Sequence, residues 1–160
     1  MSILRDVRLR DIILLTLLSC VFTFTITVPG HCDDWIYVGK NDKCLYYYNN
    51  KSITIDKESN IIKVWIKYLL TDKGKEIYLN YKKKTGIDIT DYDEISHIYE
   101  LVIYNYNKLN NTTMLFIESS ESEDVLGSGK NLDIDFDNII PKNVSDKILI
   151  KILEDHNIKR

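Results

Sequence analysis

The side chains in this sequence that could do chemistry are scattered rather than grouped. The chain has three histidines and three cysteines, and His97 lies in an alternating apolar run with no second histidine, cysteine or nucleophile nearby. Nucleophilic catalysis needs a nucleophile and a base held within hydrogen-bonding distance. We therefore interpret His97 as an ordinary strand histidine. We predict no catalytic residue, and a protein that is not an enzyme.

Two acidic groups are the candidates for a metal site. The first, within residues 87–94, lacks the ordered EF-hand loop with its central glycine and terminal glutamate. The second consists of Asp133, Asp135 and Asp137, which alternate with apolar residues in a predicted strand. Alternation places these three carboxylates on the solvent face, with no base beside them. We expect neither a metal site nor a cofactor.

The first thirty residues have the order of an export signal. Arg5, Arg8 and Arg10 precede an uncharged apolar run at residues 12–28, which Pro29-Gly30 ends. A basic region, an apolar core and a small-residue cleavage site are typical of a secretory signal peptide. The alternative is an uncleaved N-terminal anchor, since the run is at the short end of the ~17–25 residues that span a bilayer. Either way, we expect an exported protein in the periplasm, at the cell surface or secreted.

The expected compartment decides how the cysteines are interpreted. Leu-Leu-Ser before Cys20 approximates a lipobox, so Cys20 is a candidate lipidation site. If Cys20 leaves with the signal, Cys32 and Cys44 are the two remaining thiols, and one disulfide is arithmetically possible. In a hairpin that turns at residues 40–43, Cys44 lies opposite Gly39, and Cys32 lies about 23 Å further along the strand. This geometry favours two free thiols.

Composition and charge limit the domain count and the partners. The 160 residues, 44% hydrophobic and 28% charged, suffice for one globular domain at residues 31–160. The net charge is −3; removing residues 1–30, with three basic and two acidic side chains, leaves 18 basic and 22 acidic residues, or −4. Phosphate binding needs a net basic face. We expect no nucleic-acid partner, and membrane contact only through the N-terminal segment.

Runs rich in valine, isoleucine, tyrosine, threonine and tryptophan indicate a sheet. Residues 35–70 contain several such runs, separated by glycine, asparagine, aspartate and lysine, which is typical of an antiparallel meander. Residues 95–107 alternate, and a turn at residues 108–111 leads into residues 112–118, which predicts a second hairpin. The polar segment 119–130 is expected to be a flexible surface loop.

A short helix is predicted in the middle of the chain, at residues 71–85. Asp72 can cap its N-terminus, and Gly86 follows as a stop signal. Lys82 to Lys84 are interpreted as a solvated last turn that complements the helix dipole. One helical face is expected to carry the residues Ile77, Tyr78 and Tyr81.

A second helix is predicted at the C-terminus, after Pro141. Asn143 or Ser145 can cap it, and its apolar stripe repeats at helical spacing through Val144, Ile148, Leu149, Ile152 and Leu153. An apolar sheet needs such a cover. The predicted fold is therefore α+β: a small antiparallel meander of about six strands, packed by a C-terminal helix, with a short helix inserted mid-chain.

The order of these motifs resembles the bacterial surface-adhesin protein E family, over essentially the whole chain from Trp35 onward. The resemblance rests on the following motifs: Trp35-x-x-Val38-Gly39, Tyr46-Tyr-Tyr-Asn49 followed by Ser52-Ile53, Val64-Trp65-x-Lys67, Gly74 before a helix with lysine and tyrosine, and Asn138-Ile-Ile-Pro141 ahead of the helix at residues 145–153. It implies a small antiparallel sheet packed by a C-terminal helix, which agrees with the fold predicted from the residues.

The resemblance also implies a function. Members are exported, and the best known is an outer-membrane lipoprotein that binds host extracellular-matrix proteins such as vitronectin and laminin. The implied partner is thus a host extracellular-matrix protein; the alternative is an envelope structural or stress protein that acts on another envelope protein. Eleven tyrosines and two tryptophans are compatible with a binding surface. From the strand pattern, we place the candidate ligand-binding residues at Tyr46 and Tyr48.

Overall fold

The structure is a computed structural model that describes residues 34–130, 137–138 and 143–159. In chain order its elements are β1 (Trp35–Lys40), β2 (Cys44–Asn49), the 3-10 helix η1 (Asn50–Ser52), β3 (Thr54–Asp56), β4 (Ile61–Leu70), α2 (Asp72–Lys84), β5 (Ile95–Asn105), β6 (Asn110–Ser120), β7 (Val125–Lys130), β8 (Asp137–Asn138) and α3 (Val144–Asp155). The predicted signal or anchor, with Cys20, lies outside the described residues, as do Asp133 and Asp135. Neither α2 nor α3, the α-helices of the described part, has the length and apolar character needed to cross a membrane.

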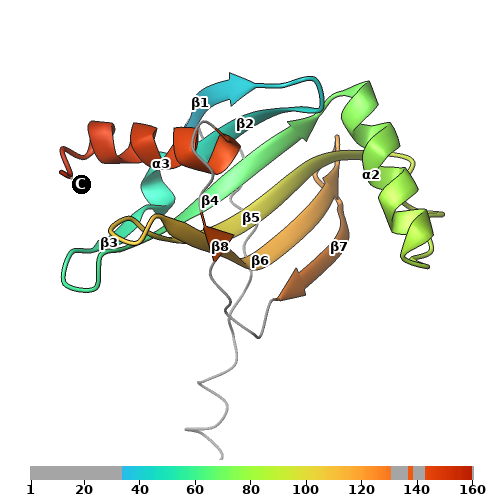
Figure 1. The fold of residues 1–160 in the computed structure, drawn as a ribbon. Coiled ribbons are helices and arrows are strands. Elements are labelled where there is room, and N and C mark those ends of the chain that lie inside the picture. The colour runs from blue at the N-terminus through green and yellow to red at the C-terminus, as the bar shows by residue number, and fades with distance from the viewer. Residues whose placement is uncertain (1–33, 131–136, 139–142, 160) are drawn as a thin grey trace, which may run out of the picture. The chain divides into compact units, whose positions relative to one another are not determined.

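The sheet is an antiparallel meander and the fold is α+β, as predicted (Figure 1). Neighbouring strands follow the order β1-β2-β4-β5-β6-β7, with β3 paired to β4 and β8 paired to β6. β2 and β3 lie end to end along one edge of β4, against residues 66–70 and 61–63 respectively. Between them the hydroxyl of Ser52 accepts a hydrogen bond from the amide of Trp65 at 3.0 Å. Without this bond, the amide of Trp65 would have no acceptor at the gap between β2 and β3.

The first hairpin has a different register from the one predicted. Its turn is held by the side chain of Asn41, whose Oδ1 accepts hydrogen bonds from the amides of Lys43 at 2.9 Å and Cys44 at 2.8 Å. Gly39 pairs with Tyr46, and not with Cys44, because β1 is irregular between residues 37 and 39. The Cys44 thiol is free, while Cys32 lies outside the described residues.

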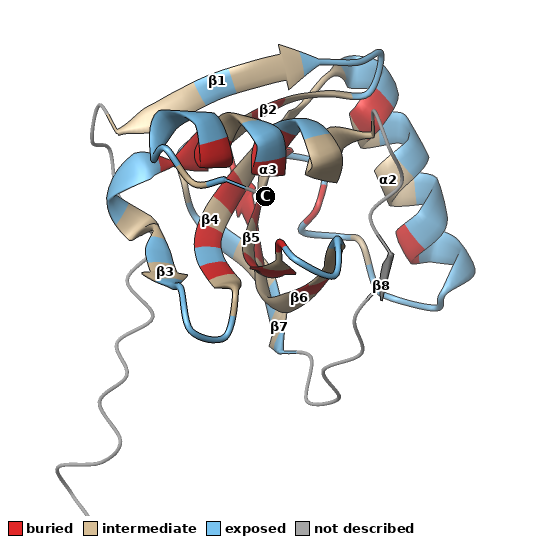
Figure 2. Cartoon of the chain, turned by 60° about the vertical axis from the view of Figure 1, so that its left-hand side comes forward, coloured by how far each residue is buried: buried red, intermediate tan, exposed pale blue. Residues whose placement is uncertain are grey.

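The prediction that a C-terminal helix packs on the sheet is confirmed. Asn143 caps α3, since its Oδ1 accepts a hydrogen bond from the amide of Asp146 at 2.8 Å. The buried stripe of α3 joins one hydrophobic core with strand residues, and this core comprises Tyr46, Tyr48, Ile62, Val64, Ile66, Val102, Tyr104, Tyr106, Ile148, Leu149, Ile152 and Leu153. Figure 2 shows these buried stretches behind and along α3.

The mid-chain helix is confirmed, but it buries a different face from the predicted one. Its cap is Thr71, whose hydroxyl accepts a hydrogen bond from the amide of Gly74 at 3.1 Å. Gly74 and Lys82 are buried, whereas Ile77 and Tyr81 are 42% and 60% exposed. The interpretation of Lys82 as part of a solvated turn is therefore wrong. Residues spaced by four lie on one face of a helix, so residues 74, 78 and 82 form the inner face of α2.

Most of the segment at residues 119–130 is strand, and only residues 121–124 form a connection outside the strands. β6 continues to Ser120, and β7 pairs with it from Val125 to Lys130 at the edge of the described sheet. The two glycines of β7 suggested a loop, but they let large side chains of neighbouring residues lie over the strand. A Cβ at Gly129 would collide with the ring of Phe116, and one at Gly127 would collide with Tyr92 and Glu118. These glycines are thus required by packing.

Both helices pack on the same face of the sheet, which we call the helix face. Side chains of directly paired residues share a face, and Tyr48 pairs with Ile66, Ile66 with Glu100, and Glu100 with Phe116. α3 contacts this row through Tyr48, and α2 reaches the same face through Glu118, two residues beyond Phe116. Figure 1 shows α3 near β1 and β2 and α2 at the other end of the sheet.

Candidate functional site

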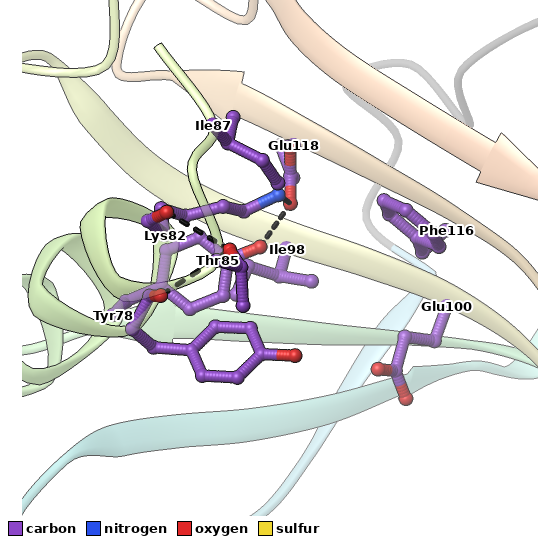
Figure 3. Close-up of a pocket in the computed structure, with 9 residues that line it drawn as sticks. Tyr78, Lys82, Thr85, Ile87, Ile98, Glu100, Phe116 and Glu118 are labelled. Atoms are coloured by element: carbon purple, nitrogen blue, oxygen red, sulfur yellow. Dashed lines mark hydrogen bonds and ion pairs between the residues drawn. The ribbon is translucent and has the colours of Figure 1, made fainter. Parts of the chain in front are cut away.

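A pocket of about 430 Å³ lies on the helix face, between α2 and strands β5 and β6 (Figure 3). The residues that line it are Tyr78, Tyr81, Lys82, Thr85, Ile87, Ile98, Glu100, Phe116 and Glu118. Tyr81 and Ile87 are exposed, whereas Glu118 is buried. In Figure 3, Tyr78 and Lys82 come from α2, and Glu100 and Phe116 lie on the strands that face them.

The polar centre of this pocket is a buried ion pair. Lys82 Nζ lies 2.5 Å from Glu118 Oε1, and the two side chains are only 8% and 1% exposed. The same oxygen of Glu118 accepts a hydrogen bond from the hydroxyl of Tyr78, and Oε2 accepts one from the hydroxyl of Tyr92 at 2.7 Å. Glu118 is therefore bound by one cation and two hydroxyl donors. A buried carboxylate requires such partners.

The pKa of Glu118 reflects these contacts. Burial raises it, but the hydrogen bonds from Lys82, Tyr78 and Tyr92 outweigh burial, and the net pKa is lowered. Glu118 is thus ionised at neutral pH. The pKa of Tyr92 is raised to about 12, and that of Tyr78 is raised as well, by burial and by their bonds to the carboxylate. Both tyrosines remain protonated donors.

Aromatic rings surround the ammonium group of Lys82. Its Nζ lies 5.3 Å from the ring centroid of Tyr78, 5.4 Å from that of Tyr92 and 5.8 Å from that of Phe116. A cation within about 6 Å of an aromatic ring is attracted by its negative face. The Lys82 end of the pocket is therefore built to hold an ammonium ion.

Glu100 is the second carboxyl group of the pocket, and its environment differs. Its Oε2 is 3.4 Å from the hydroxyl of Thr113, and it also has a hydrogen bond from Tyr68. Burial raises the pKa of Glu100 more than these two bonds lower it. Among the described lysines and histidines, none forms an ion pair with it.

A second candidate site lies on the opposite face of the sheet, and we call this face the aromatic face. Tyr37, Tyr47, Lys67 and Tyr99 lie in one row of paired residues, and alternation adds their neighbours two positions away: Trp35, Trp65 and His97. Lys67 Nζ lies 4.8 Å from the ring of Trp35 and 5.2 Å from that of Tyr47. Neither described α-helix covers this face, since both pack on the other one.

The aromatic side chains of this face contact one another across strands. The ring centroids of Trp35 and Tyr99 are 5.7 Å apart, and those of Tyr37 and Tyr47 are 5.4 Å apart. His97 stacks on Tyr99 and its Nδ1 is 3.3 Å from the carbonyl oxygen of Ser120. Burial lowers the pKa of His97. It is a strand histidine packed against the ring of Tyr99, in agreement with its interpretation from sequence.

The residues chosen from sequence as a ligand-binding surface, Tyr46 and Tyr48, lie elsewhere. They are 1% and 0% exposed and belong to the core beneath α3. The hydroxyl of Tyr48 donates to Asp155 of α3 at 2.5 Å, and that of Tyr46 is 3.5 Å from Lys147 Nζ. We correct the expectation accordingly: α3 occupies this face, so neither ring is accessible. In β2, Tyr47 lies on the aromatic face.

The sequence contains a pattern that belongs to the pocket, but the lysine run within it predicted a solvated helical turn. Gly74, Tyr78 and Lys82 recur every four residues, which is the spacing of a buried helical face, but a lysine run is usually solvated. Glu118 is the one charged residue of β6 and directly follows the apolar residues 114–117. Among the described residues, no group of histidine, cysteine, aspartate and glutamate side chains is arranged to hold a metal ion. Asp137 lies in β8.

Compared with protein-family models, curated proteins and solved structures, the chain matches none of them.

Proposed function

We propose that the chain is an exported, adhesin-like binding protein of the bacterial surface or periplasm, and that it recognises another protein through the aromatic face. The observation that supports this proposal is the row formed by Trp35, Tyr37, Tyr47 and Lys67 on a sheet face that neither α2 nor α3 covers. Export is inferred from the N-terminal sequence.

Aromatic residues around a cation have the composition of a protein interface, although in this row Tyr99 is buried and Tyr37 alone is an exposed aromatic. Tyrosine and tryptophan are enriched in interfaces and contribute much of their binding energy. Tyr37 is 50% exposed, and Lys67, whose pKa is lowered by burial, is held between two rings.

The first candidate partner is a host extracellular-matrix protein such as vitronectin or laminin, as the resemblance to surface-adhesin protein E implies. The alternative is a structural or stress role in the envelope, with another envelope protein bound to the same face. Both versions require a protein partner for the aromatic face, and they differ in where that partner is found.

The test measures saturable binding of the purified full chain to immobilised vitronectin and laminin, alongside affinity capture from an envelope extract. Tyr37→Ala should weaken binding by about tenfold or more, because it removes an exposed interface aromatic. The matched control is Ile150→Ala on α3, where the side chain is 37% exposed and lines neither site; its affinity should be unchanged. Equal effects of the two substitutions would refute the assignment of this face.

The two partner classes give different results. Saturable binding to vitronectin or laminin that Tyr37→Ala weakens supports the adhesin version. A stable envelope partner, with no matrix binding by the purified chain, supports the structural version and excludes host adhesion. If the chain binds neither matrix protein nor an envelope protein, the proposed function is wrong.

A further inference from the structure

The pocket beneath α2 has an excess of negative charge. Its ionisable lining groups other than tyrosines are Lys82, Glu118 and Glu100; one positive and two negative charges give 1 − 2 = −1 when Glu100 is ionised. Lys82 already forms an ion pair with Glu118, with 2.5 Å between Nζ and Oε1. From the described part of the chain, the donors to Glu100 are the hydroxyls of Thr113, at 3.4 Å, and of Tyr68. The charge that the pocket leaves uncompensated is therefore on Glu100.

The surroundings of Glu100 suit an organic cation better than a metal ion. Phe116 is its direct partner on β6, and Ile98 and Ile87 add apolar walls. A metal ion would need several oxygen ligands, whereas an alkylammonium needs one carboxylate, aromatic rings and apolar contacts for its stem. The Lys82 ammonium, bound to Glu118 among three rings, shows the same chemistry in the same pocket.

We infer that this pocket binds a primary organic ammonium on an aliphatic stem, with Glu100 as the counter-ion and Phe116 and Ile98 against the stem. The source of such a group is either a free alkylamine or the lysine side chain of a polypeptide. The site is on the opposite face from the proposed protein-binding surface and does not depend on it.

Binding should depend on pH in a defined direction. Only the ionised carboxylate pairs with the ammonium, and burial raises the pKa of Glu100. Affinity should therefore increase as the pH rises through that pKa, while an alkylammonium stays protonated below about pH 9. The titratable or charged groups that face Glu100 are Tyr68 of β4, Tyr104 of β5, Tyr78 and Lys82 of α2, and Glu118 of β6.

The experiment is an NMR titration of the full chain with n-pentylammonium chloride, followed by the same titration with n-pentanol, a neutral molecule of similar size. Saturable shifts at amides of α2, β5 and β6, with n-pentanol at least about tenfold weaker, are expected for a charge-assisted contact. Equal affinity for the two compounds, or shifts confined to other elements, would overturn the proposal without any variant being needed.

Two variants then test whether Glu100 is the counter-ion of the bound ammonium. Glu100→Gln keeps the shape of the side chain and should weaken n-pentylammonium binding by about tenfold or more. The matched control is Glu76→Gln on the exposed side of α2, which makes the same change in net charge and should leave affinity within about twofold. If both variants bind equally well, Glu100 is not the counter-ion and the inference is wrong.

A last comparison separates the two sources. Nα-acetyl-lysine methylamide presents the lysine side chain, and Nα-acetyl-norleucine methylamide is its neutral control. Tighter binding of the lysine amide than of n-pentylammonium identifies a polypeptide lysine as the ligand, and the reverse identifies a free amine. Either order upholds the ammonium site, whereas equal binding of the lysine and norleucine amides contradicts it.

Discussion

Replacing Lys82 by methionine is expected to destabilise the protein by about 3 kcal/mol at neutral pH. Lys82 neutralises Glu118 at 2.5 Å, where the two side chains are 8% and 1% exposed. Removing one partner of a buried ion pair costs about 3–5 kcal/mol, because the other charge stays buried. The lower value applies here, since the hydroxyls of Tyr78 and Tyr92 still donate to Glu118 and methionine retains an apolar stem.

The loss should shrink at acidic pH. In the wild type the folded-state pKa of Glu118 lies below its ordinary 4.5, so its stabilisation is present above the unfolded pKa and is lost as the pH falls through the folded pKa. Without Lys82 the folded-state pKa rises, because a cation and a hydrogen bond are gone. The variant then takes up a proton at higher pH than the wild type does. The difference in unfolding free energy is therefore largest at neutral pH and decreases as the pH falls through the variant's pKa.

Urea denaturation at about pH 7.5 and about pH 4.5 measures both effects. With a slope of about 2 kcal/mol per molar, a loss of about 3 kcal/mol lowers the midpoint by about 1.5 M. The matched control is Lys83→Met, at an exposed position in the same helical turn; it should change stability by less than about 0.5 kcal/mol.

A second substitution tests the cause of the loss. Adding Glu118→Gln to Lys82→Met removes the buried charge and should recover about 1–2 kcal/mol relative to Lys82→Met alone. The reasoning is refuted if Lys82→Met costs less than about 1 kcal/mol, if its cost is the same at both pH values, or if the double variant is less stable than the single one.

Three further predictions, one of them with a control substitution, concern how the elements are joined. Gly74→Ala should destabilise by about 1–3 kcal/mol in urea denaturation, because its Cβ would collide with the carbonyl oxygen of Lys43; no loss would show that α2 lies further from the first hairpin. Leu149→Ala in the core should cost about 2–5 kcal/mol, against about 1 kcal/mol or less for Ile150→Ala, which is 37% exposed; similar losses would contradict the docking of α3. Asn143→Ala should cost about 1 kcal/mol through loss of the helix cap, measured as the shift in the urea midpoint, and an unchanged midpoint would count against the cap.

The order and type of most elements follow from sequence, because they depend on local patterns. Alternation predicted the hairpin of β5 and β6, and an apolar stripe at helical spacing predicted α3 with its buried Ile148, Leu149 and Ile152. β7 was predicted as a loop, since its glycines weaken a strand locally. They are present because Phe116 and Tyr92 lie over that strand, and these contacts are made only across the sheet.

The sequence by itself determined the class of fold and the helix that covers the sheet, since periodicity and composition are properties of neighbouring residues. Only the tertiary structure decided which face the helices cover. Alternation shows that Tyr46 and Tyr47 point to opposite faces, but it does not show which of them a helix will cover; α3 covers Tyr46. The pocket arises in the same way, because Lys82 and Glu118 are 36 residues apart, and their pairing requires α2 to pack on β6. Burial of charge is a consequence of tertiary packing, so no local sequence pattern predicts it.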